Sequence, residues 1–294
     1  MLRIPEEGIA HMRRLFCALV LWLACGPAVA GPPPTRDDKP CRHRAVERLR
    51  AASPDGYAIY RAMEDKSFFL GWLDCRDPEL GLPTAVHESV HHITAETDAF
   101  PLLGGGEIAR PHVASRFFPP ARIAGRFRPG DFVDTYLRAG EASSAEDFLY
   151  LLDELNAYTH DLAAATALRD GGQAGSETQV AHRDGLSAQM AFVATYVETA
   201  EAGEPATWQG LRTPAVSTTV AALWGRAETV MAASCRIPDF GTEDRAFLRI
   251  ACGARPRASL AKILGRAPIC PAECLGPSAR TVLRGDETRP PPRM

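Results

Sequence analysis

The chain has 294 residues, 46% of them hydrophobic, and a formal net charge of -3. This hydrophobic content is enough to build a core, which excludes a disordered protein. The Arg residues are scattered and form neither a basic stripe nor an aromatic–basic pattern, so nothing in the sequence indicates nucleic-acid binding.

The first 30 residues have the pattern of a signal peptide. Arg13 and Arg14 precede the apolar run 15–24, and residues 28–30 form an Ala-x-Ala cleavage site. The apolar run is too short to remain as a membrane-spanning helix. We therefore expect an exported protein, periplasmic or secreted, without a permanent membrane span. A lipoprotein acylated at Cys25 is the alternative, although the residues before it match a lipobox poorly.

Cysteine usage agrees with export. An even number of cysteines follows residue 30, which is typical of a disulfide framework in an exported chain: Cys41, Cys75, Cys235, Cys252, Cys270 and Cys274. Six cysteines allow about 15 connectivities, and the sequence does not choose among them. Two cysteines precede the motif at 87–91 and four lie in the last quarter of the chain, so our working hypothesis is a Cys41–Cys75 bond with the last four paired among themselves. A zinc site made of the C-terminal cysteines is the alternative, but Cys270-x-x-x-Cys274 lacks a matching second pair.

The segment after the predicted cleavage site begins with a Pro-rich, polar stretch, residues 31–40, that resembles a linker. Residues 43–52 predict a helix. The stretches 57–60 and 68–75 combine aromatic and aliphatic residues between turn signals and so predict strands. A strand beside a metal-binding helix can pair with an extended substrate, and residues 68–73 are the candidate; an ordinary core strand is the other interpretation.

Residues 84–93 contain His87-Glu88-x-x-His91, the HExxH pattern of zinc hydrolases. Residues i and i+4 lie on one helix face about one turn apart, so the two imidazoles can share a zinc ion at about 2.0–2.1 Å. Glu88 lies about 100° further round the helix and can reach a metal-bound water without being a ligand. The alternatives are a His-rich surface helix and a helix whose histidines are packed in the core with their hydrogen bonds satisfied.

The residues around this motif also predict a helix. Thr84 is the expected N-cap after Pro83. Apolar residues recur at helical spacing and form a stripe whose edge carries both histidines: Val86, Val90 and Ile93. A pair of metal ligands belongs at such a border between core and cleft.

Glycines and prolines between Gly104 and Gly130 predict irregular chain. Loops of this length in a compact domain are often functional. We expect this one to form a cleft wall, where Arg110 and His112 can contact substrate; exposed residues without a role are the commoner case.

A second long helix is predicted for residues 144–170. Ser143-x-x-Glu146 has the form of a capping box, and Gly171-Gly172 suits the C-terminal end. Apolar residues at three- and four-residue spacing predict one buried stripe: Phe148, Leu151, Leu155, Tyr158 and Leu162. Further helices are expected over 178–201, 214–234, 243–252 and 258–265, and the Pro-rich residues 285–294 are expected to be disordered.

A catalytic zinc ion needs a third protein ligand. Glu154 lies at the border of the buried stripe and is the best candidate; a surface carboxylate is the alternative. Asp147 and Asp161 share that flank, one heptad before and after, and are candidates to accept the second ring N–H of a histidine ligand. Helical geometry places Asp153 and His160 on the outer face, toward solvent.

The pattern His87-Glu88-x-x-His91 followed by a Glu on a later helix resembles the gluzincin zinc metallopeptidases. Residues 153–158, Asp-Glu-Leu-Asn-Ala-Tyr, are similar to the third-ligand helix of several such families. The resemblance covers two short helices and departs from the thermolysin pattern. Glu154 stands 63 positions after His91 (154 − 91 = 63), and Tyr158 replaces the usual Asp one turn after the ligand.

This resemblance implies one zinc ion per chain and hydrolysis of a peptide or protein substrate, with Glu88 as general base and then acid. The oxyanion that forms needs a hydrogen-bond donor. Tyr158 is one candidate, with a core aromatic as the alternative. The other candidates are His92, His112 and His160.

We therefore expect an α+β, mostly α protein in which one zincin-like domain with a small sheet and disulfides spans residues 31–284. The predicted function is that of an exported zinc metallopeptidase. The alternative is a non-catalytic exported helical binding or structural protein in which the HExxH pattern is vestigial or arises by chance. Glu88 separates the two, because a protein that only binds metal has no need of a carboxylate there.

Overall fold

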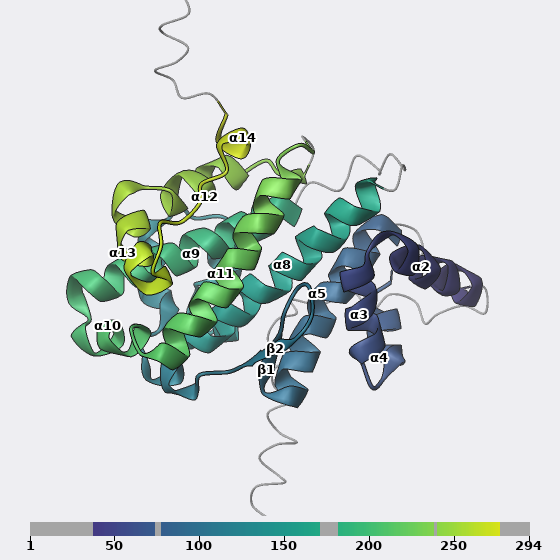
Figure 1. Ribbon diagram of the computed structural model, residues 1–294, viewed down its shortest axis with the longest axis horizontal. Helices are drawn as coiled ribbons and strands as arrows, with labels where there is room; N and C mark the ends of the chain where they lie inside the picture. Colours follow the sequence, from purple (N-terminus) through teal and green to yellow (C-terminus); the bar gives the residue numbers. More distant parts are fainter. Residues whose placement is uncertain (1–37, 74–77, 171–181, 238–239, 277–294) are drawn as a thin grey trace, which may run out of the picture.

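The computed structural model describes residues 38–73, 78–170, 182–237 and 240–276. The predicted signal peptide, the predicted tail 285–294 and Cys75 lie outside the described residues. The described part is mostly helical with one small sheet, as predicted (Figure 1).

The helices are α2 (Asp38–Ala52), α3 (Pro54–Ala62), α4 (Lys66–Gly71), α5 (Pro78–Thr97), α6 (Asp131–Tyr136), α7 (Ser143–Glu146), α8 (Phe148–Asp170), α9 (His182–Gly203), α10 (Pro205–Leu211), α11 (Pro214–Ser234), α12 (Asp244–Ala251), α13 (Ala254–Leu264) and α14 (Ala272–Leu275). Two 3₁₀ helices, η1 (His112–Arg116) and η2 (Pro120–Arg126), lie in the segment predicted to be irregular. Strand β1 (Ala99–Pro101) pairs antiparallel with β2 (Glu107–Ala109), with Phe100 opposite Ile108.

Helix α8 lies at the centre of the fold. It packs against α5 on one side and against α9 and α11 on others (Figure 1). It contributes to both hydrophobic clusters of the described residues, a larger one shared with α9, α11 and α12 and a smaller one shared with α2 to α5. The prediction of a solvent face on this helix is wrong: Asp153 is 5% exposed and His160 is 2% exposed. A helix that is covered by neighbours on several sides has no solvent-exposed face, so its polar residues do not indicate one.

The predicted strands at 57–60 and 68–75 are wrong where the structure describes them, because residues 57–60 and 68–71 are helical and residues 72–73 form no strand. Helix α3 starts after Ser53, whose Oγ accepts a hydrogen bond from the Gly56 N–H at 3.2 Å. Helix α4 starts after Asp65, which accepts from the Ser67 N–H at 2.8 Å. These N-caps decide for helix over strand. The strand that contacts α5 is β1 rather than residues 68–73.

Two helix starts also differ from the predictions. Helix α5 begins at Pro78 and continues through Pro83, so Thr84 is not its N-cap. The capping box is wrong as well, because Ala142 is the N-cap of α7 and Glu146 accepts from the Gly140 N–H instead. The predicted single helix is interrupted at Asp147, which lies between α7 and α8.

Disulfides fasten the C-terminal helices. Cys235 bonds to Cys274 and Cys252 bonds to Cys270, which confirms that the last four cysteines pair among themselves. Cys41 is also disulfide-bonded, and its predicted partner lies outside the described residues. Such bonds indicate an oxidising compartment. Among the described helices, none is long and apolar enough to cross a membrane.

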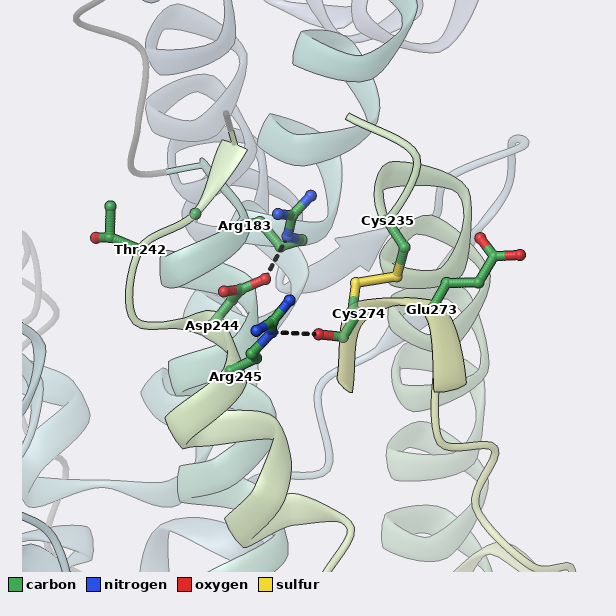
Figure 2. Close-up of a pocket in the computed structure, with 8 residues that line it drawn as sticks. Arg183, Cys235, Thr242, Asp244, Arg245, Glu273 and Cys274 are labelled. Atoms are coloured by element: carbon green, nitrogen blue, oxygen red, sulfur yellow. Dashed lines mark hydrogen bonds and ion pairs between the residues drawn. A yellow bond between two sulfur atoms is a disulfide. The ribbon is translucent and has the colours of Figure 1, made fainter. Parts of the chain in front are cut away.

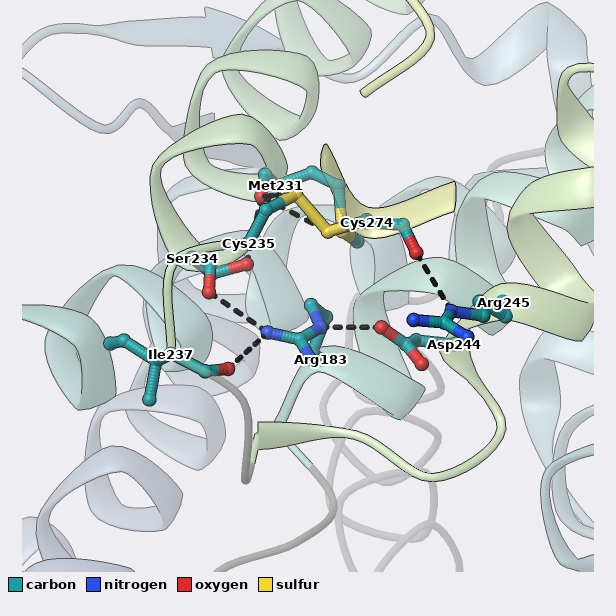
Figure 3. The surroundings of a disulfide bond; sticks show 8 residues. All are labelled: Arg183, Met231, Ser234, Cys235, Ile237, Asp244, Arg245 and Cys274. Carbon is teal, nitrogen blue, oxygen red and sulfur yellow. Dashed lines mark hydrogen bonds and ion pairs between the residues drawn. A yellow bond between two sulfur atoms is a disulfide. The ribbon is translucent and has the colours of Figure 1, made fainter. Parts of the chain in front are cut away.

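The start of α9 is tied to this disulfide-bonded region by a buried arginine. The guanidinium of Arg183 donates to Asp244 Oδ2 at 2.5 Å and to the carbonyl oxygens of Ser234 and Ile237 at 2.8 and 2.7 Å (Figure 3). The Arg183–Asp244 pair lines a cavity of about 340 Å³ beside the Cys235–Cys274 bond (Figure 2). This network fixes the beginning of α9 relative to α11 and α12.

The next residue, Asp184, makes a second tie. Its carboxylate accepts hydrogen bonds from three successive backbone N–H groups at the start of α12: those of Thr242, Glu243 and Asp244. A carboxylate at a helix N-terminus satisfies N–H groups that have no partner within the helix. Both ties therefore hold the preceding residue, His182, in a defined position facing α8.

Candidate metal centre

Three ligand atoms from α5 and α8 converge at one point. His87 Nε2 lies 3.1 Å from His91 Nε2. Glu154 Oε2 lies 3.6 Å from His87 Nε2 and 3.5 Å from His91 Nε2. These three residues form a group that can hold a metal ion, so the structure brings the predicted ligands together.

The separations fit a tetrahedral metal ion. Ligand atoms bound at about 2.0–2.1 Å to such an ion lie about 3.3–3.4 Å apart. Glu154 Oε2 is buried and has no hydrogen-bond partner among the described residues. Burying a carboxylate oxygen without a partner is unfavourable, and a cation held by the three side chains satisfies it.

Small residues let the two ligand helices approach each other. On α8, Ala157 and Ala164 are buried in the same cluster as Val86 and Val90 of α5. Because His87 and His91 are one turn apart on α5, both imidazoles point toward α8, and Glu154 lies on the side of α8 that faces them.

Asp153 orients one of the histidine ligands. Its Oδ2 lies 2.7 Å from His91 Nδ1, so the carboxylate fixes the ring with Nε2 toward the metal position. Burial alone would lower the pKa of His91, but Asp153 and Glu154 together raise that pKa well above its usual value. Asp153 directly precedes Glu154 in the sequence, and this position could have indicated a contact with His91. The prediction that Asp153 faces solvent led away from it.

We expect Asp153→Asn to weaken metal binding by about 10- to 100-fold, because the amide no longer holds the Nδ1–H of His91 as a carboxylate does. Competition with a chromogenic chelator measures the affinity. Asp147→Asn is the matched control and should leave affinity unchanged. Equal affinities for the parent and Asp153→Asn would contradict this role.

Asp147 and Asp161, predicted to orient the histidine ligands, make other contacts. Asp147 Oδ1 accepts from the Leu149 N–H at 2.8 Å and so caps α8. Asp161 Oδ1 lies 2.6 Å from Nδ1 of His182, a buried histidine that the sequence reading did not mark. His182 stands at the start of α9, just beyond a Gly-rich stretch, and no motif there drew attention to it.

Glu88 is half-buried next to the triad. Burial raises the pKa of its carboxyl group; the charge of His91 opposes this effect, and the charges of Glu154 and Asp161 add to it. A carboxylate with a raised pKa is a better proton acceptor near neutral pH. Glu88 is not one of the three residues whose ligand atoms converge, and its role as a base stays a prediction.

Tyr158 lies against the histidine pair. Its ring meets the His87 ring edge-on at 4.5 Å, and its hydroxyl lies 2.6 Å from the hydroxyl of Tyr136. A Cβ atom at Gly185 would lie 2.0 Å from this ring, so α9 needs glycine here. Burial, then the charge of Glu154, raise the pKa of both phenols. Both stay protonated, and the bond between the two hydroxyl groups uses only one of their two protons.

Tyr136 was missed because the six-residue helix α6 carries no motif. The three histidines named as other oxyanion donors have different partners. His92 Nε2 pairs with Glu96, and His112 Nε2 lies 2.6 Å from Asp98. Arg110, which with His112 was expected to line a cleft, also faces Asp98, at 3.7 Å.

His160 is the third, and it is fully enclosed. Its Nε2–H donates to the Pro101 carbonyl oxygen at 3.1 Å, and burial lowers its pKa to about 4. The unfolded chain takes up this proton near pH 6.5, whereas the folded protein does so only near pH 4. The stability contribution is therefore complete above pH 6.5 and is lost as the pH falls toward 4.

We expect the metal-free protein to lose about 2–3 kcal/mol between pH 7.5 and 4.5 through this histidine. His160→Gln keeps an N–H donor for Pro101 and removes the titration, so its loss over the same range should be smaller by that amount. Urea denaturation at the two pH values measures the difference. Equal losses would show that His160 is not held neutral.

Comparisons with protein-family models, with curated proteins and with solved structures found no match. What is known of this site is therefore its geometry: two histidines and a glutamate that can hold a metal ion, with Glu88 beside them.

Proposed function

We propose that the protein is an exported zinc-dependent metallopeptidase of the zincin type. The observation that carries the proposal is the convergence of His87, His91 and Glu154 beside Glu88. Two imidazoles and one carboxylate are one of the ligand sets of catalytic zinc sites, which leave a fourth position for water. Magnesium and calcium favour oxygen ligands and fit this set poorly.

A zinc ion held by His87, His91 and Glu154 would act as a Lewis acid and would lower the pKa of its bound water to about 7. Glu88 accepts the proton of the attacking water and passes it to the leaving amine, which its raised pKa favours. Asp153 holds the His91 ring in place throughout. The Tyr136–Tyr158 pair offers its free phenol proton to the developing oxyanion.

The first test measures metal content in the protein made through an oxidising export route, so that its disulfides form. We expect one zinc per chain in the parent and loss of zinc in His91→Ala and Glu154→Ala, since either change leaves two protein ligands. Glu141→Ala, an exposed glutamate on the approach to α7, is the control. A parent without zinc after reconstitution would overturn the proposal.

The second test is cleavage of a peptide library by the zinc-loaded parent. Hydrolysis should disappear on chelation and return with zinc. A parent that holds zinc but cleaves no peptide would favour the non-catalytic binding protein over the peptidase.

A further inference from the structure

Helix α5 leaves one stripe of its surface partly open. Glu88 and His92 are one turn apart on that stripe, about 40° from each other around the axis, and both are half-buried. On the opposite side of the helix, Val86 and Val90 are fully buried. The open stripe therefore continues past the proposed base along the helix.

The stripe is bordered by α8 on one side and by α4 on the other. Viewed along the axis, Glu88 projects between His91 and His92. His91 contacts Asp153 of α8, and His92 contacts Phe68 of α4. Figure 1 shows the same order, with α5 between α8 on one side and α3 and α4 on the other.

The α4 wall carries stacked aromatic rings. Phe68 stacks on His92 with ring centroids 4.5 Å apart, and Trp72 meets Phe68 edge-on at 6.3 Å. His92 is held by Glu96 at 2.9 Å. Trp72 is 38% exposed, which is unusual for so large an apolar side chain among the described residues. We call Phe68, Trp72 and His92 the aromatic ledge.

We propose that the aromatic ledge is a substrate subsite that binds an aromatic or large apolar side chain of the peptide. This side chain lies close to the peptide bond that is attacked by the water from which Glu88 takes a proton. This inference rests on the proposed peptidase function. Rings that are already fixed by packing bind another ring with little loss of side-chain entropy. Stacking and the burial of apolar area then favour Phe over Ala at this position.

Binding to the zinc-loaded Glu88→Gln protein tests the subsite without requiring hydrolysis. The probes are acetyl-Gly-Gly-Phe-Gly-Gly-amide and the same peptide with Ala in place of Phe, measured by calorimetry. We expect the Phe peptide to bind about fivefold tighter or more. Adding Trp72→Ala should abolish this preference. Adding Ile269→Ala, at another exposed apolar residue, should keep it. Retained zinc shows that each variant is folded.

Equal affinities for the two peptides, or a preference that survives Trp72→Ala, would overturn the subsite; so would the absence of binding for both peptides. The two proposals fail separately. A parent that cleaves no peptide while the Trp72-dependent preference persists removes the peptidase and leaves the aromatic ledge as a peptide-binding site. A parent that cleaves Phe and Ala peptides equally well keeps the peptidase and removes the subsite.

Discussion

Glu88→Gln is expected to abolish peptide hydrolysis while the protein keeps its zinc. Glutamine is nearly isosteric with glutamate, so the surroundings of His87 and His91 stay intact. It cannot take a proton from water, and loss of a general base lowers kcat by about 10²- to 10⁴-fold. Zinc content and the rate of cleavage of the best library peptide, measured on the same sample, separate the two effects.

The position makes this variant informative. Glu88 is the carboxylate on α5 whose pKa burial raises, and it stands beside the triad without being one of its ligands. Glu141→Gln is the matched control and should leave kcat unchanged. Activity of Glu88→Gln within a few-fold of the parent would show that another group accepts the proton. Loss of zinc from this variant would instead mean that Glu88 supports the metal directly.

Arg183→Met is expected to give the largest loss of stability, about 3–5 kcal/mol. It removes the charge that pairs with the buried Asp244, and it removes the guanidinium donor from the carbonyl oxygens of Ser234 and Ile237, of which Ser234 keeps the bond from the Ile237 N–H at 2.9 Å. An uncompensated buried carboxylate is the main source of the loss. Urea denaturation with the disulfides intact measures the free energy of unfolding.

The double variant Arg183→Met/Asp244→Leu is the matched control. It removes both charges, so it should recover part of the stability that the single variant loses. A single variant that loses less than about 1 kcal/mol would mean that solvent reaches Asp244. Such a result would contradict the burial of this pair.

Local sequence was sufficient to identify the three residues of the candidate metal site. The i, i+4 spacing puts His87 and His91 on one face of any helix, whatever surrounds it. Glu154 could be found because a ligand must lie at the border of an apolar stripe. The even number of cysteines after the predicted signal peptide likewise predicted disulfides, and the last four do pair among themselves.

Other features depended on contacts between distant segments. The stretches 57–60 and 68–75 have strand-like composition, but caps at Ser53 and Asp65 and packing against α5 favour helix for the described part. Tyr136 of α6 and Tyr158 of α8 stand 22 positions apart in the sequence, so their contact arises only in the folded chain. The partner of Asp161 is His182 only because Arg183 and Asp184 fix the start of α9.

The burial of α8 shows the physical reason most clearly. Periodicity along a chain determines which residues share a helix face, and it correctly placed His87 and His91 on one face of α5. It does not determine how many neighbours cover the helix. Because α5, α9 and α11 all pack on α8, Asp153 became the buried partner of His91 and His160 a buried neutral donor. The sequence by itself indicated the three candidate ligands, because helical spacing places residues on a face, whereas only the tertiary packing decided which side chains surround them.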